Sequence, residues 1–243
     1  VAVGDASYIS PGDLSVTVNG ISDEFPIEGT NLSYSIYGPN QKYVAMSLTD
    51  SNIYEYETGK YRATFTIPQS EISQSGTYSL FFRAADNVSN VGQICQSFLI
   101  DADCPTGSIS VSNAQTAMET DKLEGMNKIA VNVNDAHSGV ENSILELYNG
   151  TMQEPGIKAA TLLTNSSIPK LLDFNSYDYA DGNYTLKLTV IDKAGQTVTA
   201  WKDITIDNRI AKPIIGVSIS SGNSSLNVQW SYQEEMSELD YIQ

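Results

Sequence analysis

The sequence predicts an all-β protein in which antiparallel β-sandwiches follow one another in tandem. Three observations lead to this prediction. Apolar and polar residues alternate with the period of a strand that buries one face. One hairpin sequence occurs twice at a constant spacing. Charged residues make up only 17% of the chain, and this composition favours short strands with polar turns over long amphipathic helices.

The clearer copy of the hairpin occupies residues 181–207. The apolar side chains on alternate positions of its first strand are Tyr184, Leu186, Leu188 and Val190. A polar turn at residues 192–195 leads into a second strand, which ends at Asp207. This pattern is typical of a β-hairpin with a turn of about four residues.

The earlier copy of the hairpin lies upstream and aligns without a gap. Tyr78, Asp86 and Asp101 align with Tyr184, Asp192 and Asp207, always at the same offset (184 − 78 = 106). A repeat of this length is too long for a solenoid unit and matches a whole small sandwich domain. We therefore predict domains at residues 1–102 and 103–208, with a partial third domain at 209–243.

Shorter alternating runs fill the rest of the first two domains. In the first, a lead-in strand and a turn occupy residues 1–13, and strands are expected at 14–18, 32–36 and 61–67. In the second, a linker at 101–105 precedes strands expected at 109–111, 129–133, 144–148 and 159–163. Residues 113–127 are predicted to form a loop rather than a short helix, and the remainder of 151–180 is expected to be irregular.

The third domain is incomplete in this sequence. Leu226, Val228 and Trp230 alternate as a strand, and an acidic loop then leads to Leu239, Tyr241 and Ile242. A segment of about 35 residues cannot bury a core alone. We therefore expect a continuation of the natural chain, or edge pairing with a neighbouring subunit, to cover these apolar residues.

The acidic balance of the chain excludes nucleic acid as a partner. Asp and Glu number 29 against 13 Lys and Arg, which gives a net charge of −16. Nucleic-acid binding needs a basic surface, and an anionic membrane would repel this chain. No apolar run of about 18 residues is present, so no membrane span is expected. No signal peptide is recognisable, so Val1 either follows a removed signal or begins a fragment.

The two cysteines are expected to be free thiols. Cys95 and Cys104 would lie about 30 Å apart if the stretch between them is extended, unless the linker folds back. A disulfide needs Cα atoms within about 7 Å. Two cysteines also make neither a disulfide scaffold nor a zinc site in a chain of this size.

Residues 181–186 resemble the tyrosine corner of immunoglobulin-like domains, in which a Tyr lies two residues before a strand-F cysteine. Leu186 and Leu80 occupy that cysteine position, so the disulfide of antibody domains is absent. The last hairpin turn and residues 135–140 are similar to bacterial and archaeal surface immunoglobulin-like repeats. The run 226–230 resembles the opening of a fibronectin type III domain. The resemblance implies tandem immunoglobulin-like sandwiches, a fold that hosts many functions.

Catalytic machinery is hard to assemble from this sequence. His137 is the only histidine, it lies in a predicted turn, and a Ser-His-acid triad would have to use it. A phosphate-binding loop is absent, because Gly59 and Lys60 lack the upstream glycine spacing. Paired carboxylates stay open on spacing alone, but most acids fall in predicted turns. We predict that the chain is not an enzyme.

Four carboxylates are expected to converge where the second domain begins. In a seven-strand sandwich the B–C and F–G turns lie at the end where the chain enters, and here they contain Asp135 and Asp192. The linker brings Asp101 and Asp103 to the same end. Ca²⁺ favours such oxygen clusters, so the four aspartates are predicted calcium ligands, completed by backbone carbonyls. The alternative is that turns favour Asp for backbone reasons alone.

A bound Ca²⁺ would neutralise the repulsion between these carboxylates and fix the angle between the two domains. Extracellular modules bind Ca²⁺ at about 10⁻⁴ to 10⁻³ M, so such a site is filled outside a cell. The next junction would repeat the cluster with Asp207, Asn208, Glu234 and Glu235.

Six sequons are candidate glycosylation sites, a slight excess over what the composition alone produces. They lie at Asn31, Asn87, Asn149, Asn165, Asn183 and Asn223. Surface-facing sequons are used if the source organism glycosylates. Asn183 lies on a strand beside the tyrosine corner, so the prediction keeps the other five.

These observations favour a non-enzymatic extracellular protein that acts as a stalk, an adhesin segment, or a subunit of a surface layer or filament. Its expected partners are copies of itself, surface proteins or glycans. The alternative is an accessory region of a larger secreted enzyme with a catalytic domain beyond Gln243. More sandwich repeats downstream would favour the first hypothesis, and a catalytic domain there would favour the second.

Overall fold

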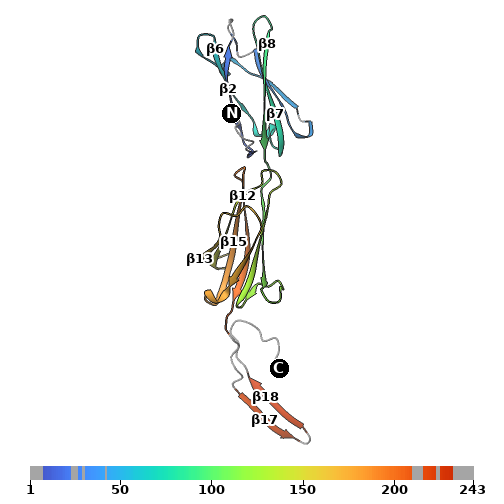
Figure 1. Cartoon of the computed structure of the whole chain (residues 1–243), viewed down its shortest axis with the longest axis vertical. Coiled ribbons are helices and arrows are strands. Elements are labelled where there is room, and N and C mark those ends of the chain that lie inside the picture. The colour runs from blue at the N-terminus through green and yellow to red at the C-terminus, as the bar shows by residue number, and fades with distance from the viewer. Residues whose placement is uncertain are drawn as a thin grey trace. The chain divides into compact units, whose positions relative to one another are not determined.

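The computed structural model confirms an all-β protein (Figure 1). It describes residues 8–22, 27–28, 31–41, 43–209, 216–222 and 225–231, the last two ranges by their backbone alone. Strands, turns and short 3₁₀ helices account for the regular structure of these residues. No helix in this described part is long and apolar enough to cross a membrane.

The first sandwich contains two sheets. The five-stranded sheet has the order β1 (Tyr8–Ile9), β8 (Val91–Ile100), β7 (Gly76–Ala85), β3 (Leu32–Tyr37) and β4 (Tyr43–Ser47). The three-stranded sheet has the order β2 (Leu14–Ser22), β6 (Lys60–Ile67) and β5 (Ile53–Glu57). Strand β1 pairs in parallel with the end of β8, and the other pairs are antiparallel.

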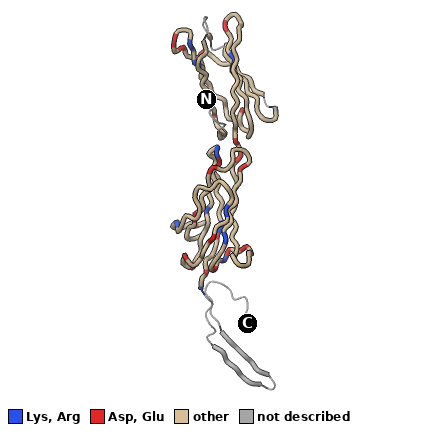
Figure 2. Tube along the Cα trace, viewed as in Figure 1, with Lys and Arg blue, Asp and Glu red and all other residues tan. Residues whose placement is uncertain are grey.

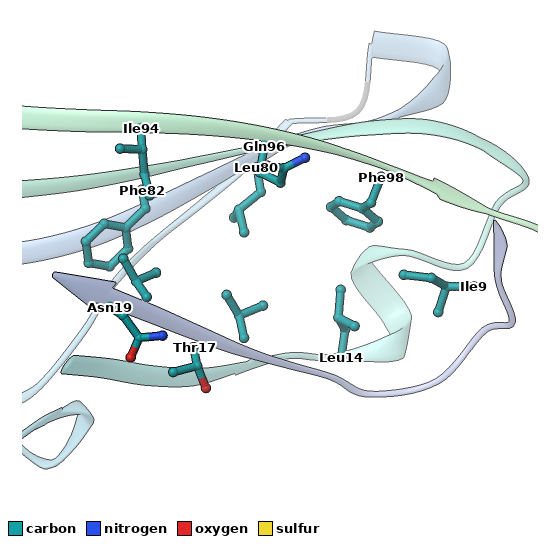
Figure 3. A pocket seen from close by; sticks show the side chains of 11 residues that line it. Ile9, Leu14, Thr17, Asn19, Leu80, Phe82, Ile94, Gln96 and Phe98 are labelled. Atoms are coloured by element: carbon teal, nitrogen blue, oxygen red, sulfur yellow. The ribbon is translucent and has the colours of Figure 1, made fainter. Parts of the chain in front are cut away.

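Alternating apolar residues build the core between these sheets. In β6 every second side chain is buried, and Phe65 stacks on Tyr34 of β3 with ring centroids 4.5 Å apart. A small apolar hollow of about 160 Å³ remains between β2 and β8 (Figure 3). Leu14 and Phe98 are among the side chains that face it. The hollow extends from the core, which supplies buried side chains such as Val16 and Phe98, to the exposed side chains of Asn19 and Ile94.

The second sandwich repeats the five-stranded sheet, but its three-stranded sheet has a different strand order. Its five-stranded sheet has the order β10 (Lys122–Leu123), β16 (Thr197–Ile206), β15 (Gly182–Asp192), β12 (Val140–Gly150) and β13 (Pro155–Leu163). Its three-stranded sheet has the order β14 (Lys170–Asn175), β11 (Met126–Asn134) and β9 (Thr106–Asn113). Strand β10 pairs in parallel with β16, as β1 does with β8.

The two copies of the repeated hairpin occupy equivalent positions. Hairpins β7–β8 and β15–β16 each lie between a short parallel edge strand and the strand that follows the B–C turn. The Tyr78 hydroxyl donates to the carbonyl of Gln74 (3.0 Å), and the Tyr184 hydroxyl donates to that of Ala180 (2.9 Å). Both are tyrosine corners of the immunoglobulin type, as the sequence predicted.

Packing divides the chain into two compact units whose limits differ from those of the sandwiches. The first unit is Val1–Thr106 with Val133–Asn142 and Val190–Val198, and the second is Gly107–Asn132 with Ser143–Thr189 and Thr199–Gln243. The linker and the turns that carry Asp135 and Asp192 therefore fall in one unit. The domain limits at 102 and 208 stay a prediction.

Five strands were not expected from the sequence, namely β4, β5, β10, β14 and β17 (Gly216–Gly222). In β14, Leu171 is 65% exposed and only Phe174 is buried, so the period-2 signal is weak. Strands β4 and β5 are also largely exposed, so they too give only a weak period-2 signal. Residues 113–127 contain no helix, and β10 is the only strand wholly inside them.

Cys95 and Cys104 are free and exposed, which confirms the absence of a disulfide between them.

The beginning of the predicted third domain contains one hairpin. Strand β17 (Gly216–Gly222) pairs antiparallel with β18 (Ser225–Ser231), and Trp230 lies opposite Val217. Residues 232–243 lie outside the described part of the chain. The fibronectin type III resemblance and the covering of Trp230 therefore stay predictions.

Candidate metal centre

Three aspartates from three separate segments meet at one point. Asp101 follows β8, Asp135 lies between β11 and β12, and Asp192 ends β15. One carboxylate oxygen from each lies within 4.8 Å of the other two. Asp101 and Asp192 are fully buried, and Asp135 is half-buried. All three belong to the first compact unit.

The β15–β16 turn fixes Asp192. The N–H of Asp192 donates to the carbonyl of Gln196 (3.1 Å), and the N–H of Gln196 donates back to Asp192 Oδ1 (2.8 Å). Gly195 adopts a φ of +89°, which glycine tolerates best. Because the turn uses only Oδ1, the second oxygen Oδ2 is buried without a hydrogen-bond partner.

The turn after β11 holds Asp135 in a similar way. Its Oδ1 accepts the backbone N–H groups of His137 (3.1 Å) and Gly139 (2.6 Å) and the Ser138 hydroxyl (3.3 Å). Its Oδ2 is buried and also has no partner. Such a carboxylate oxygen normally costs free energy, because water that was lost on burial has not been replaced.

Asp101 is bound from both sides by the linker and the two turns. Its carboxylate accepts the N–H groups of Ser138 (2.9 Å) and Asp103 (3.1 Å). The side-chain amide of Gln196 donates to the backbone carbonyls of Asp101 (3.0 Å) and Asp103 (2.9 Å). The three segments are therefore already tied together by hydrogen bonds around the carboxylates.

The buried carboxyl groups of Asp101 and Asp192 have opposite pKa shifts. Burial, followed by the charges of Asp101 and Asp135, raises the pKa of Asp192, and backbone hydrogen bonds offset only part of this. Burial also acts to raise the pKa of Asp101, but hydrogen bonds from Ser138 and Asp103 and the nearby His137 bring it below its ordinary value. Asp101 thus stays ionised and makes ionisation of Asp192 costly.

A cation would resolve this conflict. Acidic residues outnumber basic residues in the sequence, and Figure 2 marks both kinds along the Cα trace. No described Lys or Arg forms an ion pair with any of the three aspartates. The two unpartnered oxygens, Asp135 Oδ2 and Asp192 Oδ2, can accept a metal ion without breaking an existing hydrogen bond. The buried triad can therefore bind a metal, and its oxygen-only donor set suits a hard cation.

The fourth predicted ligand, Asp103, has different contacts. Its exposed carboxylate accepts the Ser75 hydroxyl and pairs with His137 Nε2 at 3.1 Å. The structure thus brings together three of the four predicted aspartates, and the fourth, Asp103, contacts Ser75 and His137 instead.

The second predicted cluster is described only in part. Asp207 lies beside Arg209 (3.6 Å), and its Oδ2 is buried without a hydrogen-bond partner. The Asn208 side chain donates to the carbonyl of Ser176 (2.9 Å). Glu234 and Glu235 lie outside the described residues, so the cluster stays a prediction.

Two supporting residues were missed by the sequence reasoning. Ser138 binds both Asp101 and Asp135, and Gln196 binds the linker carbonyls. A signal for them existed, because a residue three or four positions after a turn Asp is often within reach of its carboxylate. Their second contacts, to a linker far away in sequence, left no local pattern.

The sequons differ in accessibility. Asn87, Asn149, Asn165 and Asn183 are exposed, and Asn31 is half-buried. The Asn31 amide donates to the side-chain oxygen of Asn87 (3.2 Å). Asn223 lies outside the described residues, and glycosylation at all these positions stays a prediction.

No protein-family model matches the chain, and no curated protein matches it. Among solved structures it is similar to a Ca²⁺-stabilized adhesin of an Antarctic bacterium that binds ice, at 15% identity and a TM-score of 0.42, over 87% of this chain and 48% of that one. A tetra-tandem repeat from the extending region of a large adhesion protein gives 12% identity and a TM-score of 0.33, over 90% and 63% of the two chains.

The C-terminal domain of the Streptococcus agalactiae AgI/II polypeptide BspA gives 8% identity and a TM-score of 0.38, over 83% of this chain and 95% of that domain. The present chain spans about half of the first of these proteins and less than two thirds of the second. Because these TM-scores are low, the fold rests on its own strand pairing, and no residue role is transferred.

Proposed function

We propose that this chain is a non-enzymatic structural or adhesive segment of an extracellular, cell-surface protein, and that Ca²⁺ bound by Asp101, Asp135 and Asp192 fastens its linker to two turns. One observation carries the proposal. One carboxylate oxygen from each of the three aspartates lies within 4.8 Å of the other two, and Asp135 and Asp192 each have a buried carboxylate oxygen without a hydrogen-bond partner.

Calcium suits this donor set better than other common cations. Ca²⁺ takes six to eight oxygen ligands in flexible geometry, whereas Mg²⁺ demands a near-octahedral shell and keeps several waters. Zinc prefers nitrogen and sulfur ligands, and the one nearby imidazole, His137, is paired with Asp103. An extracellular location would keep such a site filled, because extracellular modules bind Ca²⁺ at about 10⁻⁴ to 10⁻³ M.

A structural role fits the contacts of the single histidine. His137 Nε2 pairs with Asp103, while the adjacent Ser138 hydroxyl points to Asp135. Among the described residues no serine hydroxyl hydrogen-bonds to this imidazole, so the nucleophile–base pair of a serine hydrolase is not assembled. The proposed partners are copies of the chain, surface proteins or glycans.

The test is a calcium titration of the full 243-residue chain, monitored by its thermal midpoint and by calorimetry. We expect saturable binding of one Ca²⁺ and a midpoint that rises with its concentration, because a ligand that binds only the folded state stabilises it by mass action. Mg²⁺ should give a smaller rise. Asp135→Asn and Asp192→Asn should each remove the effect.

The matched control is Asp86→Asn, which changes the equivalent turn of the first sandwich and should leave the calcium response unchanged. An unchanged thermal midpoint at millimolar Ca²⁺, or an equal rise in wild type and Asp192→Asn, would show that the site does not bind calcium.

A further inference from the structure

The outer face of the five-stranded sheet in the first sandwich carries a group of side chains that the calcium site does not use. Strand alternation directs Leu32, Tyr34 and Ile36 into the core and their neighbours outward. The register then places Arg83 between Ser33 and Gln93, and Ser35 opposite both Phe81 and Ala45.

These residues surround a shallow hollow of about 230 Å³. Small side chains line part of it, namely Ser33, Ser35, Ala45 and Ser47. Larger residues line the rest, namely Tyr34, Tyr43, Met46, Phe81, Arg83 and Gln93. Ligand pockets for drug-sized molecules typically measure about 300–1,000 Å³, so this hollow has room for one small ring.

Two of these rings are held in place by Tyr37. Its ring centroid lies 4.8 Å from that of Tyr43 and 5.4 Å from that of Phe81. Tyr43 is nevertheless 55% exposed and Tyr37 is 50% exposed. The three rings therefore form one group of mutually contacting aromatic side chains on this face, and two of them are exposed.

The charge of the hollow is opposite to that of the chain. Arg83 is exposed and has no ion pair or hydrogen bond to another described side chain, and no Asp or Glu lines the hollow. The chain as a whole has a net charge of −16. An unpaired guanidinium beside neutral hydroxyls therefore offers a local site for an anion.

We propose that this hollow binds a carboxylate-bearing sugar residue, such as a uronic acid at the end of a glycan. The Arg83 guanidinium matches a carboxylate in two-pronged geometry. The hydroxyls of Ser33 and Ser35 donate to and accept from ring hydroxyls. Tyr43 and Phe81 present apolar ring faces to the C–H face of the sugar. The site is separate from the proposed calcium centre and shares no residue with it.

The test uses the full chain with glucuronate, galacturonate and N-acetylneuraminate as probes, and with glucose and acetate as controls. Binding is measured by NMR chemical-shift titration and by calorimetry. We expect at least one acidic sugar to bind saturably at millimolar concentration and to shift the Tyr43 and Phe81 resonances. Glucose lacks the carboxylate and acetate lacks the ring, so both should bind at least about tenfold more weakly.

Three variants locate the site. Arg83→Gln should weaken the acidic sugar at least about tenfold, Arg83→Lys should weaken it less, and Tyr43→Ala should weaken it without removing the preference for charge. The matched control is Arg62→Gln, an arginine on β6 of the other sheet whose Nε donates to Asn19 (2.7 Å). It removes the same charge and should leave binding unchanged.

The proposal is overturned if no acidic sugar binds, if acetate binds as tightly as the sugars, or if Arg83→Gln and Arg62→Gln behave alike. Because Arg83 is exposed and unpaired, its variants should keep the wild-type thermal midpoint. Asp192→Asn should bind the sugar like wild type, so failure of the calcium proposal and failure of this one are distinguishable.

Discussion

The two hairpin turns at Asp86 and Asp192 share one backbone geometry but differ in how their carboxylates are satisfied. In each turn the Asp N–H donates to the carbonyl four residues on (3.0 and 3.1 Å), and that residue's N–H donates to Oδ1 (2.8 Å in both). In the first turn the side-chain amide of Asn90 also donates to Asp86 Oδ2 at 2.7 Å. In the second turn Asp192 Oδ2 has no partner.

The difference follows from one residue at the equivalent repeat position. Asn90 aligns with Gln196, which has one more methylene. The Gln196 amide does not return to its own turn and donates instead to the carbonyls of Asp101 and Asp103. The Asp192 turn is therefore tied to the linker, and Asp192 Oδ2, which has no hydrogen-bond partner, can bind a cation.

The pKa shifts follow the same division. Burial acts to raise the pKa of Asp86, but hydrogen bonds from Asn90 and Val88 outweigh it and bring that pKa below its ordinary value. The pKa of Asp192 is raised by burial and by its two acidic neighbours. The first turn therefore stabilises the ionised carboxylate of Asp86. The second turn destabilises the ionised carboxylate of Asp192, and a bound cation can offset that cost.

The largest expected difference between the turns is their response to calcium. At a Ca²⁺ concentration of about 100 Kd, wild type should gain about 2.7 kcal/mol of unfolding free energy, and Asp192→Asn should gain none. In EDTA the order should reverse, with Asp192→Asn more stable, because the amide removes a buried charge and still accepts the Gln196 N–H. Thermal melts with and without calcium measure both effects. If Asp192→Asn is less stable than wild type in both conditions, the unpartnered carboxylate oxygen of Asp192 is not destabilising in the absence of calcium.

The pH dependence in EDTA should have opposite signs at the two turns. A raised folded pKa means that the contribution of Asp192 to stability is fully present below its unfolded pKa of about 3.9 and is lost as the pH rises through the folded pKa. A lowered folded pKa means that the contribution of Asp86 is present above its unfolded pKa and is lost as the pH falls through the folded pKa.

At neutral pH, Asp192→Asn should therefore be more stable than wild type and Asp86→Asn less stable. Both differences should shrink as the pH falls through the pKa of the residue concerned. Denaturant unfolding across this pH range measures them, and differences of the same sign at neutral pH would disprove the contrast.

Exchanging the side chains at the equivalent positions should exchange part of the behaviour. Gln196→Asn should let the shorter amide reach Asp192 Oδ2, lower the pKa of Asp192 and weaken calcium binding about tenfold. Asn90→Gln should raise the pKa of Asp86. NMR titration of the carboxyl carbons follows both, and an unchanged pKa of Asp192 in Gln196→Asn would assign the difference between the turns to their surroundings alone.

The smallest expected effects concern the two tyrosine corners. Tyr184→Phe removes one hydrogen bond and should cost about 1 kcal/mol. Tyr78→Phe should cost somewhat more, because the Tyr78 hydroxyl also accepts the Gln74 N–H at 3.3 Å. Chemical denaturation measures both losses, and a larger loss for Tyr184→Phe would show that the corners are not equivalent.

The sequence by itself determined the two sandwiches. Alternation in strands such as β6 and β15 follows directly from the requirement that one face of a sheet be buried, and a gapless repeat carries that requirement from one domain to the next. The sequence could not reveal β14, because Leu171 is exposed and an exposed apolar residue does not indicate which face of its strand is buried.

For the candidate site, the sequence supplied the aspartates because turn chemistry is local. Only the tertiary structure decided which of them face one another. Asp103 lies two residues from Asp101 yet turns to Ser75 and His137, and Gln196 reaches the linker while Asn90 closes its own turn. These outcomes depend on side-chain directions and on partners far away in sequence, and neither leaves a periodic or local pattern in the chain.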